Sequence, residues 1–278
     1  MSTHAHEFGA LSGLAYLDHA LRAPLPMRAF AATETALLLC ARGALARPAL
    51  GQSIAAARTN LGRLLGASPA SIAFTRNATD SIATFARGVA WRPGDRVVTN
   101  EGEYPANVEP WRQHASVTVV PLREGRLDPG DVATALEAGG VRVLTVAAVS
   151  LATGERRDLA RLGELARKHG ALFFVDAAQA LGVLRLDVNA LGIDGLASSS
   201  RKWLMGPPEV GILHRKSAPP EDAGALPSPL LAGLGASTGW LLEVGPANIE
   251  TLALARAQRR RAVSVAAKAR MGKGARSA

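Results

Sequence analysis

The sequence predicts an α/β domain in which a mostly parallel sheet is flanked by helices. Short apolar runs such as 141–149 and 172–175 read as strands buried on both faces. Between them, 158–169 has leucines on one helical face and is followed by Gly170, a typical helix stop. Strands that alternate with helices in this way are typical of parallel sheets.

The remaining elements follow in chain order. Helices are expected over 31–45 and 58–65, the second ended by a glycine. Cys40 lies beside the apolar run 37–39 of the first helix and is expected to be a small core residue. A strand over 72–75 precedes a helix opened by Asn77. Further strands are expected over 95–100, 117–121 and 193–197, and a further helix over 128–137.

Composition places few limits on function. The chain has 278 residues, 48% of them hydrophobic, enough for one large domain or one domain and part of another. No apolar run reaches the roughly 18–20 residues of a membrane helix, and no signal peptide is evident at the N-terminus. The single cysteine agrees with a reducing compartment. The expected location is therefore the cytoplasm, with no membrane partner.

The positive charge is concentrated near the C-terminus. The net charge is +9, and residues 251–278 supply eight basic side chains and no acid, which leaves +1 for the rest. Such a run can contact nucleic acid, but it has no aromatic residues for stacking and no recognisable binding module. A solvated, flexible tail is the favoured interpretation, and nucleic-acid binding is not expected.

Two residues at predicted strand ends suggest chemistry. Asp176 ends the strand over 172–175, and Lys202 follows a second apolar stretch and the serines 198–200. Ligands of open α/β sheets bind at the carboxyl ends of the strands. An acid and a lysine there would suit pyridoxal phosphate, which needs an amine to form a Schiff base and an acid beside the ring nitrogen. The alternative is that Asp176 is only a helix cap.

Several motifs in a fixed order resemble the fold-type I, class V aminotransferase family. The family run D-x-A-Q appears as 176–179, followed by Ser199, Lys202 and the turn Gly206-Pro207. The resemblance extends from about 16 to about 214. This family includes cysteine desulfurases, selenocysteine lyases and isopenicillin N epimerase-like enzymes. It implies pyridoxal 5'-phosphate as the cofactor and an opening strand over 16–20.

The resemblance also implies roles for site residues. Lys202 would form the Schiff base and shuttle the Cα proton, and Asp176 would stabilise the pyridinium. Gln179 would bond the phenolic oxygen, and Tyr104 would stack on the ring, although a core tyrosine is the alternative. The phosphate would be held by Ala78, Thr79, Ser199 and Arg201, although Asn77, Thr79 or Asp80 could also be plain helix caps. No metal site is predicted.

Domain boundaries follow from the same resemblance. Residues 14–216 would form the cofactor-binding large domain, 217–250 a remnant of the C-terminal region, and 251–278 the basic tail. The small domain would be truncated or diverged, although in the family it supplies an arginine for the substrate carboxylate. Arg201 also replaces the usual histidine before the lysine. Sites of this family form at dimer interfaces, so a homodimer is expected.

The leading interpretation is an isopenicillin N epimerase-like enzyme that acts on an amino acid or amine through Lys202. One alternative is a cofactor-binding paralogue that is catalytically weak or vestigial. Another is a cysteine desulfurase or selenocysteine lyase-type enzyme. Desulfuration is expected to be absent or slow because Cys40, the only thiol, lies in an apolar helical run.

Overall fold

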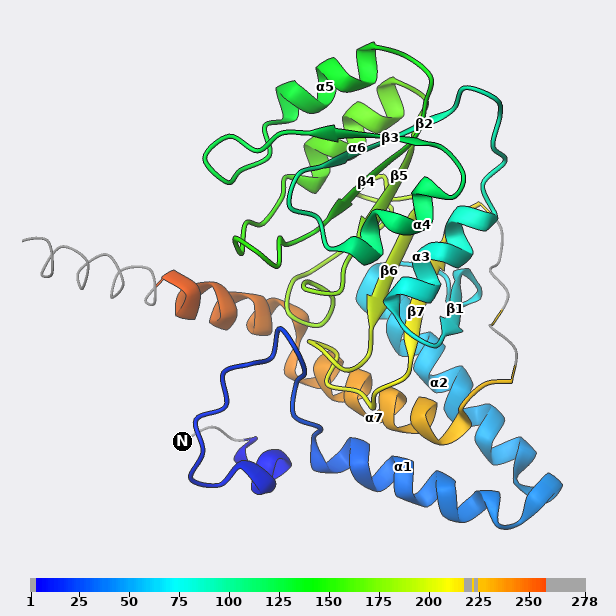
Figure 1. The fold of residues 1–278 in the computed structure, drawn as a ribbon. Helices are drawn as coiled ribbons and strands as arrows, with labels where there is room; N and C mark the ends of the chain where they lie inside the picture. The colour runs from blue at the N-terminus through cyan, green and yellow to red at the C-terminus, as the bar shows by residue number, and fades with distance from the viewer. Residues whose placement is uncertain (1–3, 218–221, 223–224, 259–278) are drawn as a thin grey trace, which may run out of the picture.

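A seven-stranded sheet forms the centre of the molecule (Figure 1). The computed structural model describes residues 4–217, 222 and 225–258. The sheet order is β1-β7-β6-β5-β4-β2-β3, and only β7 runs antiparallel to its neighbours. This confirms the mostly parallel α/β fold. The strands are β1 (Ile72–Thr75), β2 (Arg96–Asn100), β3 (Ser116–Val120), β4 (Val141–Ala147), β5 (Leu172–Asp176), β6 (Gly195–Ser199) and β7 (Gly211–Arg215).

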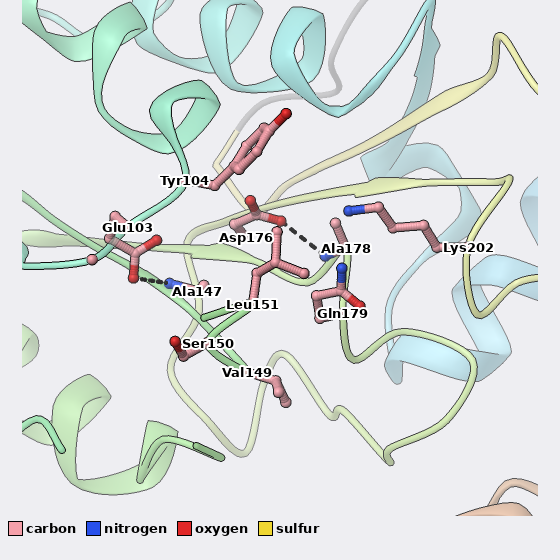
Figure 2. Close-up of a pocket in the computed structure, with 11 residues that line it drawn as sticks. Glu103, Tyr104, Ala147, Val149, Ser150, Leu151, Asp176, Ala178, Gln179 and Lys202 are labelled. Atoms are coloured by element: carbon pink, nitrogen blue, oxygen red, sulfur yellow. Dashed lines mark hydrogen bonds between the residues drawn. The ribbon is translucent and has the colours of Figure 1, made fainter. Parts of the chain in front are cut away.

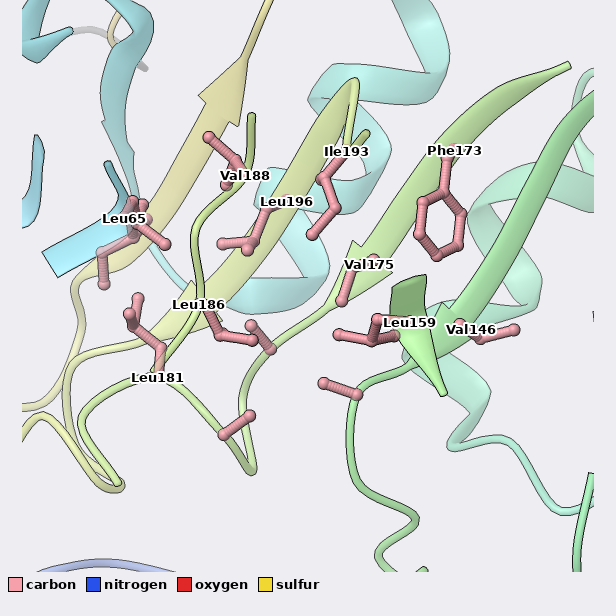
Figure 3. Close-up of a cluster of buried hydrophobic side chains, with 14 of the residues drawn as sticks. Leu65, Val146, Leu159, Phe173, Val175, Leu181, Leu186, Val188, Ile193 and Leu196 are labelled. Atoms are coloured by element: carbon pink, nitrogen blue, oxygen red, sulfur yellow. The ribbon is translucent and has the colours of Figure 1, made fainter. Parts of the chain in front are cut away.

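Helices cover both faces of the sheet because the central strands bury side chains on both. One apolar cluster joins the sheet to α2 (Arg47–Leu65), α5 (Pro129–Glu137), α6 (Leu159–Lys168) and α7 (Ser228–Val244). Part of it surrounds Phe173 and Val175 of β5 (Figure 3). A second cluster joins the opposite face to α3 (Ala78–Arg87) and α4 (Glu109–Arg112). The site-bearing strands are thus held between two apolar layers.

The predicted opening strand over 16–20 is wrong. The segment is irregular because its polar groups are used within a local turn. The Asp18 carboxylate accepts a hydrogen bond from the Leu21 N–H, and the Asp18 carbonyl accepts one from the Arg22 N–H at 3.1 Å. The Tyr16 hydroxyl donates to the Arg22 carbonyl. With these groups satisfied locally, the segment does not join the sheet.

The first helix differs from its prediction in extent and in packing. Helix α1 spans Met27–Cys40 and packs against α7. It ends before 45 because Gly43 adopts a left-handed conformation, with φ of +57°. Only Ala29 and Ala36 of α1 are buried. Cys40 is exposed, so its predicted place in the core is wrong.

The C-terminal part of the described chain is helical. Helix α7 lies beside α1 and α2 (Figure 1), and residues 246–258 form a further helix after Gly245. Glu250 in that helix accepts a hydrogen bond from the Arg185 side chain at 2.8 Å, and its other carboxylate oxygen forms an ion pair with Arg156 at 2.9 Å. The stretch expected to be a flexible tail from 251 therefore begins as helix, and 259–278 lie outside the described residues. None of the helices in the described ranges is long and apolar enough to cross a membrane.

Candidate functional site

Asp176 ends β5 at the carboxyl edge of the sheet, in register with Ala147 of β4. Its side chain is buried, and one carboxylate oxygen accepts a hydrogen bond from the Ala178 N–H at 2.8 Å. Burial raises the pKa of this carboxyl group to about 6, and the charge of Glu103 adds to the rise. The Ala178 N–H and the Lys202 ammonium group oppose it.

Lys202 lies in the turn between β6 and β7. Backbone hydrogen bonds close this turn, from Ser200 N–H to Val210 carbonyl at 3.0 Å and from Gly206 N–H to Ser200 carbonyl at 2.9 Å. The amine extends toward Asp176 and Ala178 (Figure 2). Burial lowers the pKa of Lys202, Arg201 lowers it further, and Asp176 acts in the opposite direction. The amine is therefore more often neutral than that of an exposed lysine.

The N-terminus of α3 faces the same region. Asn77 is its cap, because its side-chain oxygen accepts the Asp80 N–H at 2.9 Å. The capping alternative therefore belongs to Asn77, and the first-turn N–H groups of Ala78 and Thr79 precede the intrahelical ladder. A Cβ added to Gly211 of β7 would collide with the Thr75 hydroxyl oxygen and the Asn77 carbonyl group. This close approach requires glycine and fixes the helix start against the sheet.

The Tyr104 side chain is exposed, whereas the Gln179 side chain is already hydrogen-bonded. Tyr104 is 57% exposed, which excludes the core-tyrosine alternative. Gln179 is already engaged, because its side-chain N–H donates to the Ala20 carbonyl at 2.9 Å and its oxygen accepts the Trp203 indole N–H at 2.9 Å. One amide N–H of Gln179 remains for the predicted bond to the cofactor.

All eight residues proposed from the sequence line two adjoining cavities at this edge, and Figure 2 shows the inner one. Tyr104, Asp176 and Lys202 line both cavities. Gln179 lines the inner one, and the outer one is lined by the four predicted phosphate contacts, Ala78, Thr79, Ser199 and Arg201. The fold thus brings together residues separated by more than a hundred positions. Their individual roles stay predictions.

The cavities also contain residues to which the sequence prediction gave no role. Glu103 lines the inner cavity, and Asp18, Leu21 and Glu209 line the outer one. The place of Glu103, directly before Tyr104, was the only local signal for it. The position of Asp18 depends on how the irregular segment 16–20 lies across the sheet edge, which no local pattern encodes.

Comparison with known families identifies this arrangement. The family model for aminotransferase class-V matches residues 16–258, which is most of the chain. The chain belongs to the class-V aminotransferase family. Membership makes pyridoxal phosphate the cofactor.

The curated relatives of this class-V chain include several cysteine desulfurases. It is 34% identical to a probable cysteine desulfurase of Methanothermobacter thermautotrophicus, over 70% of this chain and 50% of the relative. It is also 34% identical to the cysteine desulfurase CsdA of Escherichia coli, over 70% of this chain and 52% of the relative. The chain therefore spans about half the length of these relatives.

Solved structures agree on the fold of this class-V chain. An apo cysteine desulfurase from Thermococcus onnurineus superposes with a TM-score of 0.79 at 25% identity, covering 86% of this chain and 70% of that one. The Escherichia coli CsdA structure gives a TM-score of 0.77 at 27% identity, covering 88% and 72%. Both are fold-type I enzymes, and this chain shares their fold.

The chemistry of the cavity residues fits pyridoxal phosphate. A buried carboxylate faces the cavity with one oxygen that accepts no hydrogen bond from the described residues. An amine with a lowered pKa lies beside it. A helix N-terminus, a serine and an arginine line the other end, where a dianionic phosphate would need donors.

Proposed function

We propose that this chain acts on the α-amino group of an amino acid or a related amine, with pyridoxal phosphate held covalently by Lys202. The observation that supports this most strongly is that Lys202, Asp176 and the start of α3 line adjoining cavities at one sheet edge. Epimerisation, transamination and elimination all begin with chemistry at the same carbon. The same site could therefore support any of these reaction types.

Each cavity residue has a proposed role that depends on where it lies. Asp176 would face the ring nitrogen and hold it protonated, and Tyr104 would cover the ring. The N–H groups of Ala78 and Thr79 would bind the phosphate together with Ser199 and Arg201. The cofactor, when bound, withdraws electrons from the substrate Cα and so makes its proton acidic.

Lys202 is the proposed acid–base group at that carbon. Its lowered pKa increases the fraction of neutral amine able to accept a proton near neutral pH. Its place between β6 and β7, in a turn closed by backbone hydrogen bonds, restricts where the amine can reach. The same nitrogen would hold the cofactor and, once the substrate amine has displaced it, would accept the proton of the substrate Cα.

A second candidate function is cleavage of the cysteine C–S bond. The 34% identity to relatives named as cysteine desulfurases favours it. Cys40 is absent from the residues that line either cavity, so it does not supply a thiol at the site. A sulfur acceptor would then be an external thiol, because Cys40 is the only cysteine of the sequence.

The test is a cofactor titration followed by an amino-acid panel. We expect purified protein with pyridoxal phosphate to show the visible absorption of covalently held cofactor, and that absorption to change with at least one amino acid. Sulfide release from L-cysteine with dithiothreitol, unaffected by Cys40→Ser, would select the second function. A chain that binds cofactor but changes with no amino acid would support the vestigial alternative.

We also propose that the chain forms a homodimer. Large apolar side chains gather on the N-terminal segment and α1, among them Leu17 at 79% and Leu38 at 71% exposure. Several large apolar side chains exposed on the same part of a protein are typical of an interaction site. We expect sedimentation analysis to give a dimer, and Leu38→Glu to shift it toward monomer. An unchanged dimer in that variant and in Leu17→Glu would place the interface elsewhere.

A further inference from the structure

A buried ion pair includes one residue that lines the inner cavity. The side chains of Glu103 and Arg157 are each 1% exposed, and a guanidinium nitrogen lies 3.5 Å from a Glu103 carboxylate oxygen. The other terminal nitrogen of Arg157 lies 3.2 Å from Glu155. Glu103 itself lines the inner cavity with Asp176 and Lys202. A buried carboxylate at a ligand cavity is costly unless it is paired and hydrogen-bonded.

Glu103 connects the segment that carries Tyr104 to the edge that carries Asp176. One carboxylate oxygen accepts the Ala147 N–H at 2.9 Å (Figure 2), and Ala147 is in register with Asp176. The other oxygen accepts the Asn107 side-chain N–H at 3.0 Å. The buried Asn107 in turn accepts the Thr145 hydroxyl group at 2.8 Å. The residue before Tyr104 is thus tied to β4 at two points.

We propose that Glu103 and Arg157 are positioning residues of the cofactor site: their buried pair anchors the Tyr104 segment to the Asp176 edge and balances the charge that Asp176 experiences. The proposal rests on the proposed function, because it assigns these residues to the pyridoxal phosphate site. Neither residue is expected to touch the reacting atoms. Their effect would pass through Tyr104 and Asp176.

The charge balance gives the two residues opposite effects. The charged groups that line the two cavities with Asp176 are Glu103 and Lys202, and farther out Asp18, Arg201 and Glu209. Glu103 disfavours ionisation of Asp176, and Lys202 favours it. Arg157 compensates the charge of Glu103 through their ion pair. Removing the Glu103 charge should therefore lower the pKa of Asp176. Removing the Arg157 charge should raise it.

A purely structural role would not produce this sign pattern. A buried ion pair is weak evidence of stabilisation, and losing either partner destabilises the fold. Both single variants would then weaken cofactor binding at every pH without moving its pH dependence. An electrostatic role predicts that the pH midpoint of cofactor binding shifts in opposite directions in the two single variants.

The experiment measures the dissociation constant of pyridoxal phosphate across pH 5–8, by quenching of tryptophan fluorescence, for wild type, Glu103→Gln and Arg157→Met. We expect the acidic midpoint to fall in Glu103→Gln and to rise in Arg157→Met, each by on the order of 0.5–1 pH unit. The free cofactor titrates identically in all samples, so differences report the protein. The double variant should return toward the wild-type midpoint.

Matched variants separate this effect from general damage. Arg157→Lys keeps the charge and should keep the midpoint. Glu250→Gln removes another buried, arginine-paired carboxylate that lines neither cavity, and should leave the midpoint unchanged. The circular dichroism of the bound cofactor should weaken in Glu103→Gln and not in Glu250→Gln, since only the first loosens the Tyr104 segment.

Midpoints that do not move, or that move in the same direction, would overturn the proposal. If Arg157→Met does not fold, an unchanged midpoint and dichroism in Glu103→Gln would overturn it alone. Failure of wild type to bind pyridoxal phosphate would instead contradict the proposed function. The two failures are therefore distinguishable.

Discussion

Replacing Lys202 with alanine is expected to abolish covalent attachment of the cofactor and to reduce turnover by at least about 10²–10⁴-fold, the range that a positioned acid–base group contributes. The loss of the attachment site adds to this. The cofactor should still bind non-covalently, because the phosphate contacts at the start of α3 and at Ser199 do not depend on the amine. Borohydride reduction followed by peptide mapping should place the label on Lys202 in wild type and nowhere in the variant.

Lys168 provides the matched control for this experiment. It is exposed in the last turn of α6 and lines neither cavity. Lys168→Ala should therefore keep both the label and the activity. Label found on another lysine of the wild-type protein would show that the site is misassigned, even though the family is correct.

The sheet and most of the site could be predicted because their signals are local. Strands such as β1 and β5 contain a short apolar run, and Asp176 ends the run of β5 at the edge of the sheet. Asn77 is a typical helix cap in sequence and in structure. Helix α2 begins eleven residues before its predicted start, at Arg47-Pro48. Proline in the first helical turn was an available signal for this start.

What could not be predicted depends on long-range contacts. The apolar residues around Cys40 suggested a core helix, but α1 buries only a narrow alanine stripe against α7 and leaves Leu37 and Leu38 exposed. The pairing of Glu103 with Arg157 joins residues 54 positions apart (157 − 103), across β4. Neither arrangement leaves a periodic trace in the sequence, since each depends on which surfaces the fold brings together.

Replacing Asp176 with asparagine is expected to stabilise the cofactor-free protein at pH 8 while it impairs catalysis. The ordinary pKa of the carboxyl group is 3.8, and burial raises it to about 6 in the folded state. The folded protein therefore binds this proton more tightly than the unfolded chain does. The stability associated with the proton is fully present below pH 3.8 and is lost as the pH rises through about 6. At pH 8 the ionised carboxylate costs about 3 kcal/mol, which asparagine avoids while its oxygen keeps the Ala178 hydrogen bond.

Urea unfolding of the cofactor-free wild type and Asp176→Asn at pH 8 and pH 5 measures this effect. The advantage of the variant should be largest at pH 8 and should shrink at pH 5, because the wild-type carboxyl group is then largely protonated when folded. Asp131→Asn serves as the control, since Arg123 lowers the pKa of that partly exposed carboxyl group and no stabilisation is expected. With cofactor and substrate, Asp176→Asn should turn over far more slowly, because an amide cannot hold the ring nitrogen protonated. A variant less stable than wild type at pH 8 would show that the ionised carboxylate of Asp176 stabilises the fold as a structural cap, which would contradict the prediction.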